Sequence, residues 1–313
     1  MTAPCIVIVC GGESAEAEVS RRSAQGVTRA LAQNFDQIHT LELDRHLAHN
    51  LTRLAPDVVF PVLHGPPGED GTVQGFLEIL QIPYVGSGVH ASATGMDKVL
   101  SKHCFRDSEL DVARQMVVHR SDSIPAAVSD ILEQLGDYIV VKPARQGSAI
   151  GVFRVDNANQ LHAAITAAFD YDTTLLVEQR IDGREITVGV LETDEGLEAF
   201  PVIEVRTPEN TWYDYEHRYT AGLSQHVMPA ELDAEQTDRL QWAAIAAHTA
   251  LGCRDLSRAD FVVPNRATEI LLEVNTLPGM TPTSLYPEGA AAIGYPFEKL
   301  VQHLIERALR RKQ

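Results

Sequence analysis

The first third of the chain alternates short apolar strands with helical patterns, which restricts the folds that it can adopt. Residues Cys5–Cys10 form an apolar run of strand length, followed by a turn at Gly11-Gly12 and a helical pattern from Glu16 to about Ala32. A second apolar run, Val58–Leu63, ends at His64-Gly65. Strands that alternate with helices form parallel sheets covered by helices, whose ligands bind at the carboxyl ends of the strands. We therefore expect an α/β unit with a site near these two glycine-containing turns.

Beyond residue 97 the pattern changes to that of α+β units. The 313 residues, 44% of them apolar, are enough for two or three packed layers and more than one domain. We expect a first unit over residues 1–97, a second over 98–185 and a third over 186–313. The elements predicted in the second unit are a helix from Lys98, strands around Met116–His119 and Tyr138–Lys142, and a helix at 157–169. Those predicted in the third are strands at 186–191 and 199–205, a polar aromatic segment at 210–224, a helix at 234–251 and two further strands.

Charge and cysteine content argue against several classes of function. The net charge of −17 argues against a nucleic-acid or anionic-membrane partner, because such partners are bound through a basic surface. The four cysteines lack CxxC or Cys/His ligand spacing, so we interpret them as reduced packing residues of a cytoplasmic protein. We find no charged-then-apolar leader and no run of ~18 apolar residues, so we expect neither export nor a membrane span.

Polar side chains gather at the ends of two strands near the C-terminus. One apolar strand leads into Glu273-Val-Asn275, and period-2 alternation puts Glu273 and Asn275 on one face. The strand before it begins with Arg258-Ala-Asp260. Together these side chains suit Mg²⁺, which takes carboxylate and amide oxygens and shares itself with phosphates. The alternative is that the residues after Asn275 form only a turn that follows a buried strand.

A glycine-bounded loop, Lys142-Pro-Ala-Arg-Gln-Gly147-Ser-Ala-Ile-Gly151, has features of a phosphate-binding segment. Gly147 and Gly151 allow backbone N–H groups to approach phosphate oxygens, and Lys142 supplies a positive charge. The loop lacks the Gly-Lys-Ser/Thr of a Walker loop, and the glycines near residue 11 lack the dinucleotide-binding spacing. A hairpin turn between two strands explains the same residues without a ligand.

Three further charged residues are candidates for nucleotide contacts. Lys98 opens a helix, although a lone lysine at such a position is most often a solvated surface charge. Glu178 and Glu185 flank the turn at 181–184, where the second and third units meet, so they are placed to hold a ribose or an adenine. A charged surface turn is the alternative explanation.

Seven motifs occur in order between residues 11 and 285. They are Gly11-Gly-Glu-Ser-Ala-Glu16-Ala-Glu-Val-Ser20, His64-Gly-Pro-Pro-Gly-Glu69-Asp-Gly-Thr-Val-Gln74-Gly75, Pro83-Tyr-Val-Gly-Ser-Gly88, Lys142-Pro through Gly151, Tyr213-Asp-Tyr-Glu-His-Arg-Tyr219, Arg258-Ala-Asp260, and Glu273-Val-Asn275 through Ser284-Leu285. By these motifs the chain resembles the D-alanine–D-alanine ligases of the ATP-grasp superfamily. The first two motifs, paired with Pro278-Gly-Met-Thr-Pro-Thr-Ser284, separate this family from biotin-dependent carboxylases and glutathione-type ligases.

The resemblance implies an ATP-grasp fold preceded by an N-terminal parallel-sheet domain. Residues 1–97 would form the substrate-binding domain, 98–185 a central subdomain with the phosphate loop, and 186–313 a C-terminal subdomain with a lid loop and the Mg²⁺ site. The implied activity is the ATP-dependent joining of two D-alanine molecules through an acyl phosphate, for peptidoglycan synthesis. Such phosphoryl transfer depends on positioning and electrostatic clamping, not on covalent side-chain chemistry.

The resemblance also implies roles for individual residues at the nucleotide. The residues implied to bind ATP are Lys98 and Lys142 at its phosphates and Glu178 and Glu185 at its adenine and ribose. The implied metal ligands, for two Mg²⁺ ions or Mn²⁺ in their place, are Asp260, Glu273 and Asn275. Arg258 and the backbone N–H of Gly279 would stabilise the developing oxyanion.

For the substrates, the resemblance implies that Glu16 pairs with the ammonium of the first D-alanine and that His64 lies beside it. Ser284 and the Leu285 backbone would receive the carboxylate of the second D-alanine. Ser148 and Tyr219 would form a hydrogen-bonded trio with Glu16, under a lid at 210–224 that excludes water. The alternatives are a helix-dipole role for Glu16, a hydrogen-bonded core histidine at position 64, and a plain helix cap at position 284.

Two departures from the family pattern leave the acceptor substrate open. Arg218 stands where the family usually has lysine, which keeps the charge for a phosphate contact but exchanges an ammonium for a planar fork. Ala149 stands where a serine is common. The alternatives are a ligase that accepts D-lactate or another D-amino acid, and a catalytically silent nucleotide-binding protein; the intact metal and arginine set argues against silence. The family's habit implies a homodimer.

Overall fold

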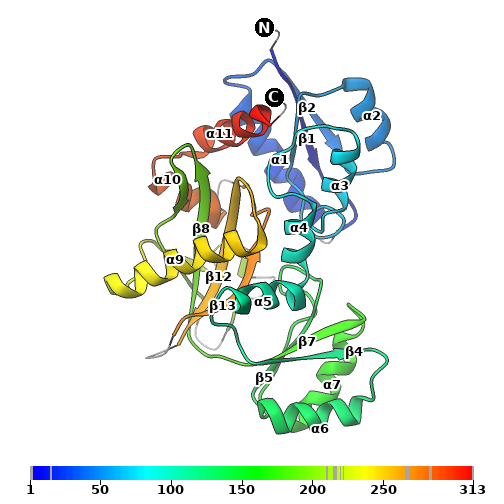
Figure 1. Cartoon of the computed structure of the whole chain (residues 1–313), viewed down its shortest axis with the longest axis vertical. Coiled ribbons are helices and arrows are strands. Elements are labelled where there is room, and N and C mark those ends of the chain that lie inside the picture. The colour runs from blue at the N-terminus through cyan, green and yellow to red at the C-terminus, as the bar shows by residue number, and fades with distance from the viewer. Residues whose placement is uncertain are drawn as a thin grey trace.

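The computed structural model describes residues 3–14, 16–208, 211–213, 217–218, 220, 222–264, 268–281 and 284–311. Within these ranges the strands form three sheets, each built from a different part of the chain (Figure 1). None of the helices described there is long and apolar enough to cross a membrane.

The first sheet is parallel, as the alternation of strands and helices predicts. Its order is β2-β1-β3, from β1 (Cys5–Cys10), β2 (Gln37–Glu42) and β3 (Val58–Pro61). One face packs against α1 (Ala17–Leu31) and α11 (Phe297–Arg310), and the other against α2 (Leu47–Leu54) and α3 (Thr72–Ile79). Because both faces are covered, β1 and β3 are continuous apolar runs. Gly11-Gly12 and His64-Gly65 follow their carboxyl ends.

The second sheet is antiparallel and has helices on one face. Its order is β4-β7-β5-β6, from β4 (Gln115–His119), β5 (Ile139–Pro143), β6 (Phe153–Val155) and β7 (Thr174–Gln179). The two helices that share a core with these strands are α6 (Ile124–Leu135) and α7 (Ala158–Ala168) (Figure 1). The loop between β5 and β6 reaches the first unit, because Ser148 in this loop donates a hydrogen bond to Glu16.

The third sheet has six antiparallel strands. Its order is β11-β10-β8-β12-β13, with β9 also paired to β8. The strands are β8 (Arg184–Thr193), β9 (Gly196–Ala199), β10 (Ile203–Arg206), β11 (Gln225–Val227), β12 (Leu256–Val263) and β13 (Ile270–Asn275). The helix α9 (Ala234–Leu251) packs on one face beside α5 (Lys98–Asp107), and α10 (Leu285–Ala292) contacts β8 (Figure 1). A further helix, α4 (Val89–Met96), leads from the first sheet into α5.

Most predicted elements are confirmed, and α9 has the predicted bounds. The single strand predicted at 199–205 is wrong, because β9 ends at Ala199 and β10 begins only at Ile203. Pro201 lies in the gap and has no N–H to donate to a strand ladder. β8 begins at Arg184, two residues before its predicted start. The sequence did not predict β2 as a strand, because its residues are largely exposed and show no alternation of apolar and polar side chains.

The division of the chain into domains stays a prediction. The three sheets fall within the three predicted ranges except for the first residues of β8. However, the C-terminal helix α11 returns to the first sheet, and Leu300 and Leu304 share a core with Ile6 and Ile8. The third range therefore contributes to the core of the first, and Figure 1 shows α11 beside α1 with both chain ends nearby.

Candidate active site

Two cavities meet between the sheets. The large cavity, of about 600 Å³, is lined by β5, the β5–β6 loop, the end of β7 and parts of β8, β10 and β13. The small cavity, of about 360 Å³, is lined by the start of α1, the loop after β3, the tip of the β5–β6 loop and the segment after β13. Lys98, Arg218 and Glu273 line both cavities. A ligand in the large cavity can therefore meet one in the small cavity at these three charged side chains.

The predicted cluster on two strands forms. In the antiparallel pair β12–β13, Asp260 lies opposite Glu273, and Arg258 lies opposite Asn275, so all four side chains share one face. The register shifts after Asp260, which leaves Leu272 without a partner on β12; such a bulge re-aims neighbouring side chains. The predicted strand pair is therefore confirmed, and its role as a metal site stays a prediction.

Arg258 is fixed by Asp260 through two hydrogen bonds, of 2.8 Å from Nε and 2.7 Å from its terminal nitrogen. Thr187 on β8 donates a further 2.7 Å hydrogen bond to Asp260. Burial disfavours the charge on Arg258, but the adjacent Asp260 carboxylate leaves the pKa of Arg258 above its usual value. A permanently charged guanidinium thus faces the small cavity.

Glu273 is ionised in spite of its burial. Lys98 Nζ lies 3.2 Å from Glu273 Oε2 and also donates a 2.7 Å hydrogen bond to the Gln146 carbonyl. Burial opposes ionisation, but Lys98, Arg218 and Lys142 together lower the pKa of Glu273 to about 2. Lys98 is only 9% exposed, so the surface-charge alternative is wrong.

Arg218 is held against an aromatic ring. Its guanidinium carbon lies 4.6 Å from the centre of the Tyr213 ring, and its Nε donates a 3.3 Å hydrogen bond to the Tyr213 carbonyl. Stacking on an aromatic face suits a planar guanidinium. The arginine that stands where the family usually has lysine is therefore held by Tyr213 at the junction of the two cavities.

The lysine of the glycine-bounded loop is joined to the first of the two predicted nucleotide glutamates. Lys142 forms an ion pair with Glu178, whose other oxygen pairs with Lys102. Glu178 is 3% exposed, and although burial opposes its ionisation, the two lysines lower its pKa to about 2. Glu185, the second glutamate, is also ionisable within the large cavity; burial raises its pKa, and Arg218 opposes the rise. The predicted assignment of Glu178 to adenine stays a prediction, because its carboxylate is engaged by lysines here.

The tip of the β5–β6 loop reaches the start of α1. Ser148 Oγ donates a 2.5 Å hydrogen bond to Glu16 Oε1, across 132 positions of sequence. Ser148 and Ala149 have φ of 50° and 58°, a left-handed conformation that costs free energy for residues other than glycine and often marks functional loops. The loop connects two antiparallel strands, as the hairpin alternative predicted. It also lines both cavities. Glu16 stands at the N-cap of α1, where the helix dipole also favours a carboxylate, although its side chain makes no capping hydrogen bond.

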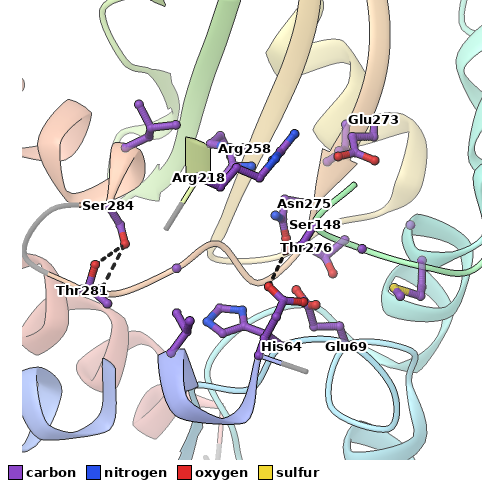
Figure 2. Close-up of a pocket in the computed structure, with 18 of the residues that line it drawn as sticks. His64, Glu69, Ser148, Arg218, Arg258, Glu273, Asn275, Thr276, Thr281 and Ser284 are labelled. Atoms are coloured by element: carbon purple, nitrogen blue, oxygen red, sulfur yellow. Dashed lines mark hydrogen bonds between the residues drawn. The ribbon is translucent and has the colours of Figure 1, made fainter. Parts of the chain in front are cut away.

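His64 and Glu69 lie together below the small cavity. Figure 2 shows them facing Arg258 and Arg218, with Ser284 and Thr281 at one end of the cavity and Glu273 at the other. His64 Nε2 is buried without a hydrogen-bond partner in the described part of the chain, unlike a satisfied core histidine. Burial and Arg258 lower the pKa of His64, although Glu16 opposes them.

Glu69 had no predicted role. Burial and then the nearby Glu16 raise the pKa of Glu69 to about 8, although the Gly65 N–H donates a 2.6 Å hydrogen bond to its carboxyl group. The signal in the sequence was its place beside His64 in the second motif.

The far end of the small cavity is formed by the segment that precedes α10. Ser284 stands at the N-cap of α10 without capping it; its Oγ accepts a 3.1 Å hydrogen bond from Thr281 N and lies 2.7 Å from Thr281 Oγ1. The helix-cap alternative is therefore wrong. Leu285 and Gly279 line the same end, and a Cβ at Gly279 would lie 3.0 Å from Ser284 Oγ.

Part of the predicted lid lies outside the described residues, including Tyr219 and Tyr215. Trp212 lines the large cavity and Tyr213 the small one, so described residues of the predicted lid segment line both, and the lid role stays a prediction. Among the described residues the predicted trio is represented by Ser148 and Glu16. His226 on β11, hydrogen-bonded to Glu288 at 2.7 Å, also lines the small cavity and carried no sequence signal.

The chain matches two models of one protein family. That described as D-ala D-ala ligase C-terminus matches residues 104–306, and that described as D-ala D-ala ligase N-terminus matches residues 37–87. The D-alanine–D-alanine ligase of Halalkalibacterium halodurans is 42% identical over 308 residues, which are 98% of this chain and 99% of that protein.

Solved structures agree over the whole chain. The D-alanine–D-alanine ligase of Bacillus anthracis, complexed with ATP, has a TM-score of 0.85 and 31% identity and covers 99% of both chains. The VanG D-Ala:D-Ser ligase of Enterococcus faecalis has a TM-score of 0.84 and 31% identity and covers 98% of this chain and 100% of that one. The predicted ATP-grasp fold with a preceding parallel-sheet domain is thereby confirmed. The chain belongs to the D-alanine–D-alanine ligase family.

Proposed function

We propose that this protein is an ATP- and Mg²⁺-dependent ligase that joins two D-alanine molecules into D-alanyl-D-alanine for peptidoglycan synthesis. The observation that carries the proposal is the meeting of the two cavities at Lys98, Arg218 and Glu273. A nucleotide fits the large cavity, which has lysines at one end and acidic groups near Glu185. Its terminal phosphate then reaches the small cavity, whose charged groups suit amino acids.

In the first step Glu16, held by Ser148, binds the ammonium of the first D-alanine and directs its carboxylate towards the junction. A carboxylate oxygen attacks the terminal phosphorus of ATP, the bond to ADP breaks, and an acyl phosphate forms. Lys98, Lys142 and Arg218 stabilise the negative charge that moves during this transfer. His64, kept neutral by its burial, lies beside the reacting carboxylate.

In the second step the deprotonated amine of a second D-alanine attacks the carbonyl carbon of the acyl phosphate. Arg258 and the Gly279 N–H stabilise the oxyanion, and phosphate leaves with its bridging oxygen. Ser284 and the Leu285 backbone receive the carboxylate of the second D-alanine. Trp212 and Tyr213 belong to the lid that protects the acyl phosphate from water.

The metal ligands would be Asp260, Glu273 and Asn275. No group of three His, Cys, Asp or Glu side chains suited to a metal occurs in the described ranges, so the site depends on the amide oxygen of Asn275 together with two carboxylates. This donor set fits a hard cation, because all three groups offer oxygen on one face of β12–β13 and Glu273 is ionised. When bound, Mg²⁺, or Mn²⁺ in its place, neutralises phosphate charge.

The substrate assignment is tested by ADP release with a panel of D- and L-amino acids and D-lactate, followed by mass identification of the products. We expect rapid ADP release with D-alanine, little with L-alanine, and the dipeptide as the main product when D-alanine and D-lactate are mixed at pH 7. If the product at pH 7 were mostly ester, or if turnover were faster with D-serine as acceptor, the second substrate would not be D-alanine. Equal rates with both alanine enantiomers would contradict the assignment.

We also propose that the protein acts in the cytoplasm, where ATP is available, and forms a homodimer. Support for the dimer comes from Ile79 and Val89, which are 81% and 41% exposed on the neighbouring helices α3 and α4. Light scattering after size-exclusion chromatography should give twice the mass of the 34.3 kDa chain. A single-chain mass at micromolar concentration would contradict the dimer.

A further inference from the structure

A lysine absent from the sequence-based predictions lies in the wall behind the large cavity. Lys102 follows Lys98 by one turn of α5, and its side chain is fully buried. Its ammonium pairs with one oxygen of Glu178 on β7, while Lys142 on β5 pairs with the other. Lys102 Nζ also lies 3.5 Å from the Leu271 carbonyl on β13. Lys102 therefore contacts both sheets that enclose the cavity.

The ion pairs around Lys102 leave one positive charge unbalanced. Lys98 pairs with Glu273, and Lys102 and Lys142 both pair with Glu178, so three ammonium groups face two carboxylates. If Lys102 were neutral, Glu178 and Lys142 would neutralise each other. Glu178 is nearly inaccessible to water, so solvent would not compensate its charge. Lys142 would then be attracted to Glu178 more strongly than when a charged Lys102 shares that carboxylate.

We propose that Lys102 is a positioning residue for the nucleotide: by sharing Glu178, it leaves the charge of Lys142 available to the phosphates of ATP. Lys142 lines the large cavity, whereas Lys102 does not, so Lys102 acts only through Glu178. Burial lowers the pKa of Lys102 to about 8, against the effect of Glu178, so Lys102 is mostly protonated at neutral pH. The inference rests on the proposed function only for the binding of ATP.

A purely structural role for Lys102 makes different predictions. A buried tie between α5, β7 and β13 would lower stability when removed and would weaken every ligand of the cavity alike. A positioning role acts on the phosphates alone. It also predicts that removing the charge of Glu178 repairs the loss of Lys102, because Lys142 then has no carboxylate to neutralise it.

The test measures dissociation constants by calorimetry for ATP, ADP and adenosine, together with the melting temperature. The variants are Lys102→Met, Glu178→Gln and the double variant, with Lys299→Met on the surface as the matched control. We expect Lys102→Met to weaken ATP and ADP about tenfold, a change worth about 1.4 kcal/mol, and adenosine less than twofold. In the double variant the ratio of ATP to adenosine affinity should return to within about threefold of that of the unmodified protein.

Three results would overturn the proposal. Lys102→Met binds ATP as tightly as the unmodified protein, it weakens adenosine as much as ATP, or the double variant has the same low ratio of ATP to adenosine affinity as Lys102→Met. Should Lys102→Met not fold, Glu178→Gln alone decides: an adenine contact of Glu178 affects ATP and adenosine alike, so the proposal requires the ratio of ATP to adenosine affinity in Glu178→Gln to be at least that of the unmodified protein. Because binding is measured apart from turnover, a protein that binds ATP but makes no dipeptide contradicts the proposed function while the variants still decide the role of Lys102.

Discussion

Ser148 and Glu16 show how single residues from distant segments meet in the small cavity, where we propose that D-alanine binds. Glu16 begins α1 but is held by Ser148, which the β5–β6 loop carries in a left-handed conformation. The hydrogen bond fixes a carboxylate that would otherwise sample several rotamers. We interpret the strained conformation of Ser148 as the cost of bringing its hydroxyl to Glu16.

Ser148→Ala should therefore weaken the binding of D-alanine more than that of ATP. A hydrogen bond to a charged group contributes about 1.5–3 kcal/mol, so the KM for D-alanine should rise about tenfold or more. Steady-state kinetics with each substrate varied in turn would show this, with Ser123→Ala on the exposed start of α6 as the control. An unchanged KM for D-alanine would mean that Ser148 does not orient Glu16.

Glu69 should make stability depend on pH in a direction opposite to most carboxylates. Its pKa is about 8 in the folded protein against an ordinary 4.5, so the folded state holds a proton that the unfolded chain releases. This stabilisation is complete below about pH 4.5 and is lost as the pH rises through about 8. The melting temperature of the unmodified protein should fall relative to that of Glu69→Gln across this window. The exposed Glu133→Gln on α6 serves as the control. If the melting temperatures of the unmodified protein and of Glu69→Gln changed in parallel with pH, the raised pKa of Glu69 would be refuted.

At the scale of elements, the pair β12–β13 carries the three proposed metal ligands and Arg258, the arginine proposed to stabilise the oxyanion, on one face. Glu273→Gln keeps the shape of the side chain but removes a carboxylate from that face. We expect turnover to fall about 100-fold or more, a loss typical for a group that stabilises transition-state charge. The fold should persist, because glutamine fills nearly the same volume and the Glu273 side chain is 29% exposed.

A titration of ADP release against Mg²⁺ checks this prediction, with Glu198→Gln on the exposed strand β9 as the matched control. The Glu273→Gln protein should also need more Mg²⁺ for its residual activity. Full turnover of that variant at limiting Mg²⁺ would mean that β13 does not hold the metal.

The elements that sequence predicted best are those with a strong local signal. Period-2 alternation placed Glu273 and Asn275 on one face, and an uninterrupted helical pattern gave α9 its correct bounds. Lys102 and Glu69 escaped prediction because their importance depends on partners that only the tertiary fold brings close, Glu178 for one and Glu16 for the other. The left-handed backbone of Ser148 was equally hidden, since nothing in the residue type requires it.

At the scale of the whole molecule, distant parts of the chain are joined around the two cavities. Asp255, at the start of β12, is fully buried and pairs with Arg311 after α11; it also accepts a 2.8 Å hydrogen bond from the Gly86 N–H. The C-terminal helix thereby connects the first sheet to the third. This frame holds the small cavity, which draws residues from α1, the loop after β3 and the segment after β13, against the large cavity.

The central claim is that the carboxylate of D-alanine takes up the terminal phosphate of ATP where the two cavities meet. The most direct measurement uses D-alanine labelled with ¹⁸O at both carboxyl oxygens, with ATP and Mg²⁺, and determines the masses of the phosphate and the dipeptide. The account predicts that each phosphate released carries one ¹⁸O atom and that each dipeptide retains the other three, with one ADP formed per dipeptide. Unlabelled phosphate, or ADP formed without dipeptide, would contradict it.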